Sequence, residues 1–154
     1  MVQPLASEIY TAHLHITGGR EGHGRSSDGV LDLQLATPGT GKPGTNPEQL
    51  FGIGYSACFL SAMHIGALQQ KFRLPKEASV NADVTLGKTA AGDYQLKLVL
   101  NIDLPGVDEG IKRQLVEYAH RTCPYSRATH GDIEVEDVII GTETLLAEDD
   151  VDVI

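Results

Sequence analysis

The chain has 154 residues, enough for one domain that buries its own core, and 41% of them are hydrophobic, with no Trp among them. Acidic residues outnumber basic ones by 21 to 12, which gives a formal net charge of −9. This charge argues against binding to nucleic acid or to an anionic membrane, because phosphate surfaces attract an excess of Lys and Arg.

The N-terminal segment predicts two strands and no export signal. The first ten residues, MVQPLASEIY, have neither the basic nor the apolar region of a signal peptide, so we expect a cytoplasmic protein. Residues 8–16 and 30–36 alternate between apolar and polar side chains, as strands do. GGREGHGRSSDG, between them, has turn chemistry and no nucleotide-binding pattern.

A helix should follow the Pro/Gly-rich loop at 37–45. Asn46 is a good N-cap, Pro47 suits the first helical position, and Gln49 stands where a capping box places an amide. The run at 50–68 carries no charge, so we expect a helix that is buried nearly all round. Its many small residues predict close packing against another element, favouring a second copy of the chain. No run reaches the roughly 18 consecutive apolar residues of a membrane span.

The second half of the chain predicts a hairpin, a helix and a last strand, at 78–88 with 94–104, 107–122 and 132–140. In the helix, the side chains expected to point inward are Ile111, Leu115, Val116 and Ala119. The order β-β-α-β-β-α-β with mostly antiparallel signals indicates an α+β fold. We expect one domain over residues 1–140 and an acidic tail over 141–154.

The chain has two cysteines, Cys58 and Cys123. They could be packing residues, half of a metal site, a structural crosslink or a redox couple. A thiol in mid-helix is most often a small hydrophobe, and burial raises its pKa. Cys123 precedes a Pro that could open a short helical turn, PYSRAT, where backbone N–H groups favour thiolate. Metal binding is not expected, because CxxC and HxxxH patterns are absent from the sequence and the His13/His15 pair is common on strands.

Several segments together resemble the OsmC/Ohr family of thiol peroxidases, and most closely its organic hydroperoxide resistance (Ohr) subgroup. In chain order they are TGGREG (17–22), SSDG (26–29), GTNPEQLF (44–51), GYSACF (54–59) and CPYS (123–126). The resemblance extends to about residue 140. It implies an OsmC-like α+β fold, with antiparallel sheets around a buried central helix. It also implies an intertwined homodimer with active sites at the subunit interface.

The same resemblance implies roles for four residues. Cys58 corresponds to the peroxidatic thiol, Cys123 to the resolving thiol, Arg20 to the catalytic arginine and Glu48 to its partner carboxylate. Such proteins reduce organic hydroperoxides, alkyl or fatty-acid, to alcohols through a sulfenic acid and a disulfide. A lipoylated protein or dihydrolipoamide then restores the dithiol, and no bound cofactor is expected.

Physical chemistry adds one requirement to these roles. An ordinary thiol is only a few per cent ionised near neutral pH, so a nucleophilic Cys58 needs a cation beside it. Arg20 can supply that charge, and lowering the pKa by two units corresponds to about 2.7 kcal/mol. Glu48 and Cys58 would lie about 15 Å apart along one continuous helix. Either the helix breaks at Gly52 or Gly54, or two subunits share one site; we favour sharing.

The substrate pocket is the least specific prediction. Apolar residues near Cys58 could favour alkyl or lipid hydroperoxides over hydrogen peroxide, although core packing is the simpler expectation for most of them: Leu50, Phe51, Ile53, Phe59 and Met63. Two other functions stay open. One is a peroxide sensor or binding module whose disulfide signals without turnover, and the other is a structural dimer with inert thiols.

Overall fold

The computed structural model describes residues 1–141, so nearly all of the predicted acidic tail lies outside the described residues. The chain separates into two compact units, Met1–Leu50 and Phe51–Ile154, called here the N-terminal and C-terminal units. Each is described by itself.

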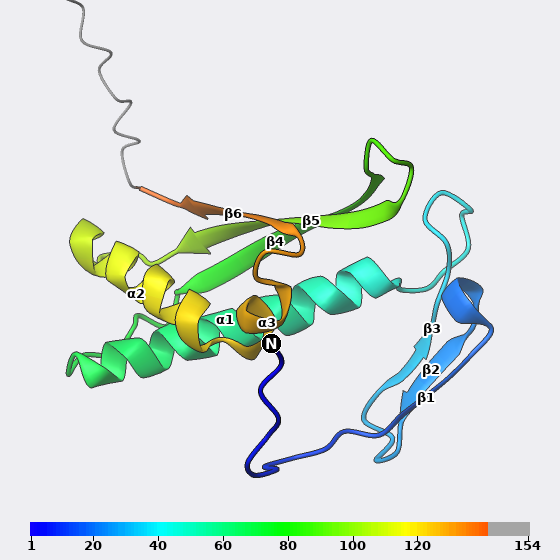
Figure 1. The fold of residues 1–154 in the computed structure, drawn as a ribbon, viewed down its shortest axis with the longest axis horizontal. Helices are drawn as coiled ribbons and strands as arrows, with labels where there is room; N and C mark the ends of the chain where they lie inside the picture. The colour runs from blue at the N-terminus through cyan, green and yellow to red at the C-terminus, as the bar shows by residue number, and fades with distance from the viewer. Residues whose placement is uncertain (142–154) are drawn as a thin grey trace, which may run out of the picture. The chain divides into compact units, whose positions relative to one another are not determined.

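The N-terminal unit contains an antiparallel three-stranded sheet in the order β1-β2-β3 (Figure 1). Its elements are β1 (Leu14–Thr17), the short 3-10 helix η1 (Gly19–Glu21), β2 (His23–Ser26) and β3 (Asp32–Gln34). Strand β2 lies inside the segment predicted to be a turn. That prediction was wrong because ladder hydrogen bonds on both sides of β2 override the low strand propensity of its residues. Strand structure also begins at Leu14 rather than at residue 8.

This sheet has very little core of its own. Among residues 1–50, all of which are described, only Leu35 and Ala36 are buried. Leu14 and Ile16, two residues apart on β1 and therefore on one face, are 51% and 57% exposed. An apolar sheet face without a covering layer is typical of a surface that packs against something else.

Helix α1 (Pro47–Gln69) starts as the sequence predicts. The side chain of Asn46 accepts a hydrogen bond from the backbone N–H of Gln49 at 2.9 Å, which confirms the N-cap. The capping box is not formed, because the side-chain oxygen of Gln49 accepts from the hydroxyl of Thr45 at 2.8 Å instead. The helix runs unbroken through Gly52 and Gly54, so the alternative of a helix break is wrong.

In the C-terminal unit one side of α1 packs into a core and the other side is open. Tyr55, Phe59 and Met63, spaced by four, are fully buried. The opposite side is an apolar stripe of exposed residues, defined as Ile53, Ala57, Ser61, Ile65 and Leu68. The expectation of burial nearly all round is therefore wrong for the single chain.

Small residues on α1 make room for the chain's own side chains. A Cβ built on Gly54 would lie 2.6 Å from the hydroxyl of Tyr125, and one on Gly66 would lie 2.7 Å from the ring of Tyr118. The predicted close approach is thus confirmed, but in these two places the neighbour belongs to the same chain. By length and composition α1 could also cross a membrane, a test that soluble core helices pass too, and its buried face is that of a core helix.

The C-terminal unit is a two-layer arrangement with helices on one face of a sheet (Figure 1). Its remaining elements are β4 (Ser79–Lys88), β5 (Tyr94–Asp103), α2 (Glu109–Thr122), α3 (Pro124–Thr129) and β6 (Glu134–Ile139). Strands β4 and β5 form the predicted hairpin. Strand β6 pairs with β5 in parallel, a departure from the mostly antiparallel expectation, because the connection through α2 and α3 is long enough to return the chain to the same end.

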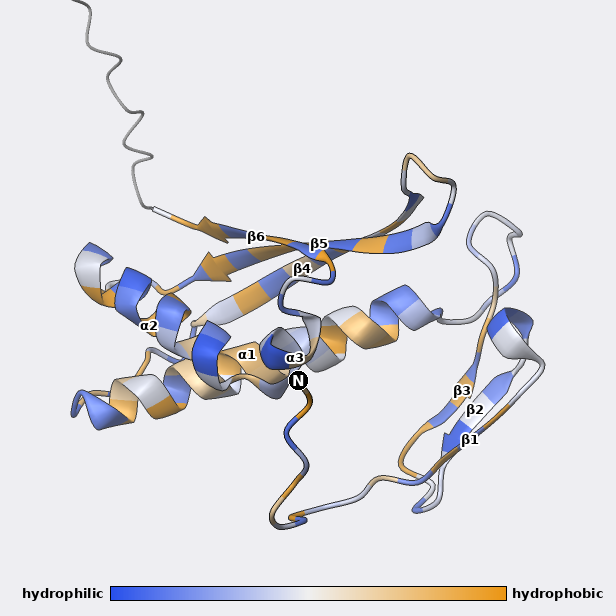
Figure 2. Ribbon diagram, in the orientation of Figure 1, coloured by the Kyte–Doolittle hydropathy of each residue, from blue (hydrophilic) through white to orange (hydrophobic). Residues whose placement is uncertain are grey.

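The core of this unit lies between the sheet and the helices. Along β5 the side chains of Leu98, Leu100 and Ile102 are fully buried, and the alternate positions are polar apart from Val99; Figure 2 shows apolar and polar residues along the strand. Leu115 and Ala119 of α2 meet them from the helical layer, as predicted. Helix α2 begins two residues later than expected, after its N-cap Asp108.

Candidate active site

Arg20 and Glu48 form a bidentate ion pair within the N-terminal unit. The two guanidinium nitrogens of Arg20 donate to the two carboxylate oxygens of Glu48 at 3.0 and 2.5 Å. Arg20 lies in η1 and Glu48 in the first turn of α1, where a negative charge is favoured. The Arg20 hydrogen bond is the main reason that the pKa of Glu48 lies below its ordinary value. The predicted pairing is confirmed, and it leaves the guanidinium held in one orientation.

Cys58 and Cys123 lie together in the C-terminal unit, although 64 residues separate them in sequence. Both are free thiols; Cys123 is fully buried and Cys58 half-buried. The two thiols lie close enough for Cys123 to raise the pKa of Cys58. The fold therefore supplies the proximity that the sequence could not establish.

Cys123 occupies the joint between two helices. Its backbone N–H donates to the carbonyl of Ala119 at 2.7 Å, closing α2, and its carbonyl accepts from the N–H of Arg127 at 3.0 Å, opening α3. Pro124 follows at the first helical position, as expected, and disfavours a helical conformation at Cys123. The thiol is consequently fixed by backbone geometry on both sides.

The C-terminal unit by itself favours a protonated Cys58. Burial raises the pKa of the Cys58 thiol, and the Cys123 thiol raises it further. The backbone N–H of Tyr125 lowers it, as the least of these influences. An ionised Cys58 at neutral pH therefore requires a positive charge that these three contributions do not provide.

Aromatic rings of α1 and α3 pack against one another in the C-terminal unit. Phe51 and Tyr125 meet edge to face with centroids 6.0 Å apart, and Tyr55 lies 5.8 Å from Phe51 and 5.6 Å from Tyr125. The sequence reasoning did not include Tyr55 or Tyr125 among the site residues. The signal was available, since Tyr125 is part of CPYS and Tyr55 is one of the few polar groups in an uncharged helix.

The five predicted pocket residues do not share one environment. Phe59 and Met63 are fully buried in the core, and Phe51 is partly buried against it. Leu50 and Ile53 are 38% and 71% exposed. Core packing thus accounts for the first three, while the last two face outward in the single chain.

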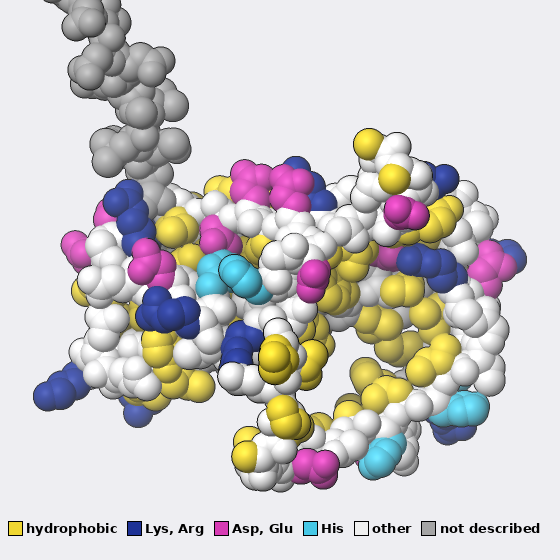
Figure 3. Space-filling model, in the orientation of Figure 1, with side chains coloured by type: hydrophobic (Ala, Val, Ile, Leu, Met, Phe, Trp, Pro, Cys, Tyr) yellow, Lys and Arg dark blue, Asp and Glu magenta, His cyan; other side chains and the backbone are white. Residues whose placement is uncertain are grey.

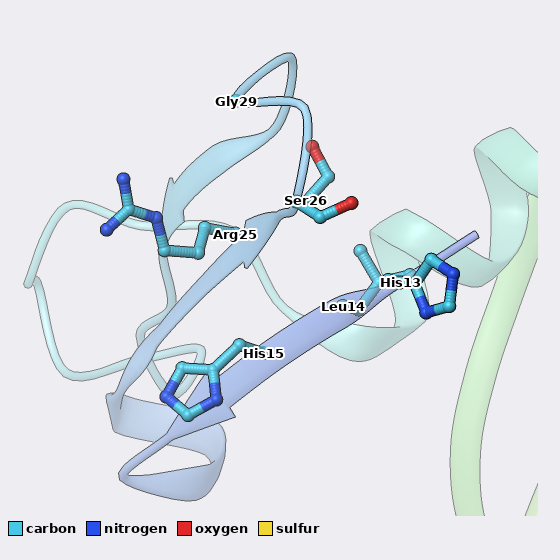
Figure 4. Close-up of a pocket in the computed structure, with 7 residues that line it drawn as sticks. His13, Leu14, His15, Arg25, Ser26 and Gly29 are labelled. Atoms are coloured by element: carbon cyan, nitrogen blue, oxygen red, sulfur yellow. The ribbon is translucent and has the colours of Figure 1, made fainter.

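A cavity of about 300 Å³ lies in the N-terminal unit, next to β1 and β2 (Figure 4). It is lined by His13, Leu14, His15, Arg25, Ser26, Ser27 and Gly29. His13 and His15 have no third ligand near them, because within residues 1–141 no group of three His, Cys, Asp or Glu is placed to hold a metal ion. The groups considered for catalysis are therefore the thiol pair, Cys58 with Cys123, and the ion pair, Arg20 with Glu48.

Comparison with known proteins agrees with this reading of the fold. A family model described as OsmC-like protein matches residues 39–136, more than half of the chain. The chain belongs to the OsmC-like family. The α+β fold of that family, predicted from the sequence, is confirmed.

The relatives narrow the resemblance. An organic hydroperoxide resistance protein from Xanthomonas axonopodis pv. citri is 48% identical over 131 residues, covering 82% of this chain and 92% of that protein. OhrA of Bacillus subtilis, another organic hydroperoxide resistance protein, is 43% identical over 137 residues, covering 85% and 96%. The crystal structure of OhrB of Bacillus subtilis matches with a TM-score of 0.79 and 36% identity, covering 84% of this chain and 98% of that one. The predicted resemblance to the Ohr subgroup is confirmed.

Proposed function

We propose that this protein is a cysteine-based peroxidase that reduces organic hydroperoxides. The observation that carries the proposal is that two free thiols, Cys58 and Cys123, lie close together within one folded unit. Relatives named for organic hydroperoxide resistance support a role as a redox protein that counters such peroxides.

In the first step the Cys58 thiolate attacks the peroxide oxygen that becomes bound to sulfur. The O–O bond breaks, an alcohol leaves after taking up a proton, and Cys58 becomes a sulfenic acid. Arg20 supplies the cation that the C-terminal unit lacks, and its positive charge can stabilise the departing alkoxide. Glu48 holds the guanidinium in place, in line with the bidentate contact.

In the second step Cys123 condenses with the sulfenic acid to form a disulfide and water. An external dithiol then restores both thiols by exchange, and we propose a lipoylated protein or dihydrolipoamide in that role. The cycle needs no bound cofactor. A reducing cytoplasm suits a pair of thiols that must return to the reduced state.

A homodimer completes the proposal. The apolar stripe on α1 and the uncovered face of β1 are surfaces that a second copy could bury. Hydrophobic side chains are visible at the surface in Figure 3. Because α1 does not break between Glu48 and Cys58, sharing of one site between two subunits is the alternative that remains.

The deciding experiment measures thiol loss and turnover with cumene hydroperoxide and dihydrolipoamide. The unmodified protein should lose two thiols rapidly and sustain turnover, whereas Cys58→Ser should consume peroxide no faster than buffer. Cys123→Ser, the matched control, should still react once and retain an oxidised Cys58. Appreciable turnover by Cys58→Ser would refute the peroxidase. Rapid disulfide formation without turnover would select a sensor, and unreactive thiols would select a structural dimer.

A further inference from the structure

A chain of hydrogen bonds beside the thiol pair joins four elements of the C-terminal unit. His120, in the last turn of α2, has its Nε2 atom 2.7 Å from a carboxylate oxygen of Asp137 on β6. Its Nδ1 atom lies 3.1 Å from the hydroxyl of Ser126 on α3. That hydroxyl lies 2.6 Å from the hydroxyl of Tyr55 on α1. The peroxide chemistry proposed above uses none of these four side chains.

One arrangement of protons satisfies the whole chain. With its proton on Nε2, neutral His120 donates to Asp137 and accepts at Nδ1 from Ser126, and Ser126 accepts from Tyr55. Ser126 is only 4% exposed and Tyr55 is fully buried, so water cannot easily replace these partners. The ring of Phe59 packs edge to face on the imidazole, with centroids 4.8 Å apart. His120 is thereby held from three sides.

The hydrogen-bond chain passes through α3, the short helix whose N-cap is Cys123, the proposed resolving thiol. Helix α3 has six residues, too few to be stable without tertiary contacts. Cys123 is its N-cap, and the backbone N–H of Tyr125 reaches the Cys58 thiol. Ser126 is the next residue. Whatever fixes Ser126 therefore also fixes both groups of α3 that meet Cys58.

We propose that His120 is a positioning residue for formation of the Cys58–Cys123 disulfide, acting through Ser126 to hold α3 in register with α1. The inference rests on the proposed function. In the step concerned the Cys123 sulfur attacks the sulfenic sulfur, the S–O bond breaks and the S–S bond forms. The proton of Cys123 leaves with the hydroxyl as water, so no further oxidant or reductant is needed. Disulfide geometry is narrow, and a displaced α3 slows this step while leaving attack on peroxide alone.

The test separates the two steps in the full-length protein by acid quenching after a pulse of cumene hydroperoxide. Alkylation reports loss of the Cys58 thiol, and intact mass after dimedone treatment reports sulfenic acid against disulfide. His120→Ala should leave the first rate within about threefold and slow disulfide formation by about tenfold or more, with a dimedone adduct accumulating. His130 is an exposed histidine at the C-cap of α3, and His130→Ala should change neither rate.

Ser126→Ala keeps the inference testable if His120→Ala does not fold. It should produce the same selective slowing, and the double variant should be no slower than either single one, because both act through one hydrogen bond. Disulfide formation at the unmodified rate in both variants would overturn the inference and leave the peroxidase intact. Equal slowing of both steps would also overturn it, since that is the mark of a merely structural role. If the unmodified Cys58 did not react with peroxide, the proposed function would fail first.

Discussion

The two units of this chain differ in what they bury and in what they hold in place. The N-terminal unit buries two of its fifty residues and places a charged pair, Arg20 with Glu48, in a fixed bidentate contact. The C-terminal unit has a continuous apolar core and places two thiols in it. Arg20 therefore belongs to the N-terminal unit, and the two thiols belong to the C-terminal unit.

In the proposed peroxidase neither unit is sufficient, because Cys58 and the arginine that would ionise it belong to different units. The environment of Cys58 within its own unit raises the thiol pKa, which favours the unreactive form at neutral pH. The sheet that carries Arg20 has an apolar face and almost no core to stabilise it. In the proposed homodimer the second copy of the chain buries the apolar face of the N-terminal sheet and supplies the cation that Cys58 needs. Substitutions in each unit test this division between the charged pair and the thiols.

The largest effect is expected from a charge on the apolar stripe of α1. In the proposed homodimer Ile53→Asp removes an apolar side chain from each half of a symmetric interface, at about 1.5–3 kcal/mol per side chain. The dimer should weaken by about a thousandfold, and light scattering with size-exclusion chromatography should show monomers at micromolar concentration. Tyr94→Asp, an exposed aromatic position at the start of β5, is the control and should stay dimeric. A dimeric Ile53→Asp protein would place the interface elsewhere.

The next effect concerns the charge that the C-terminal unit lacks. Arg20→Ala, made in a Cys123→Ser background, should raise the pKa of the Cys58 thiol and slow its alkylation at pH 7 by about tenfold or more, because less of the thiol is ionised. Arg20→Lys should restore little, because an ammonium lacks the planar fork. Arg25→Ala, on the neighbouring strand β2, is the control and should change nothing. An unchanged dependence of the alkylation rate on pH in Arg20→Ala would show that Arg20 does not lower the pKa of Cys58.

Mixing two inactive variants sharpens the same prediction. If Arg20 of one subunit serves Cys58 of the other, heterodimers of Arg20→Ala and Cys58→Ser chains contain one complete site. Turnover should then return on mixing, after dissociation and reassembly. Heterodimers that stay inactive would mean that both residues come from one subunit.

The smallest effect is expected from the partner carboxylate. Glu48→Gln keeps the shape but loses the charge, so Arg20 is oriented less firmly and turnover should fall about tenfold or less. Since the pKa of Glu48 lies below its ordinary value, the pair stays ionised at neutral pH and is lost only in acid, below that value. Any loss of activity between pH 7 and 5 should therefore persist in Glu48→Gln, as protonation of Cys58. Glu21→Gln, an exposed acid beside Arg20, is the control.

Local chemistry could be predicted from sequence where one residue type permits one geometry. Asn46 at the start of α1 and Pro124 after Cys123 were such positions, and so were the alternating strands of the hairpin. Strand β2 could not be predicted, because its pairing partners rather than its own residues decide its conformation. The open side of α1 was missed because an uncharged helix looks the same whether its own chain or another covers it.

In the candidate site, too, some features could be predicted from the sequence and others depend on the folded topology. The family resemblance predicted the Arg20–Glu48 contact and a working pair of cysteines; the contact is present in the structure and the two thiols lie close together, while their roles stay predictions. The bonds of His120 did not follow, because they join α2, α3 and β6, and only the folded topology brings these elements together. No local pattern around His120 announces such a contact.

Gly54 leaves the space beside α1 that the side chain of Tyr125 occupies. Any side chain there would meet the hydroxyl of Tyr125, and the same tyrosine carries the N–H that reaches Cys58. Position 54 therefore accepts no side chain unless Tyr125 shifts. One residue earlier, Ile53 faces outward and feels no such restriction from its own chain, so neighbouring positions on one helix turn obey opposite rules for substitution.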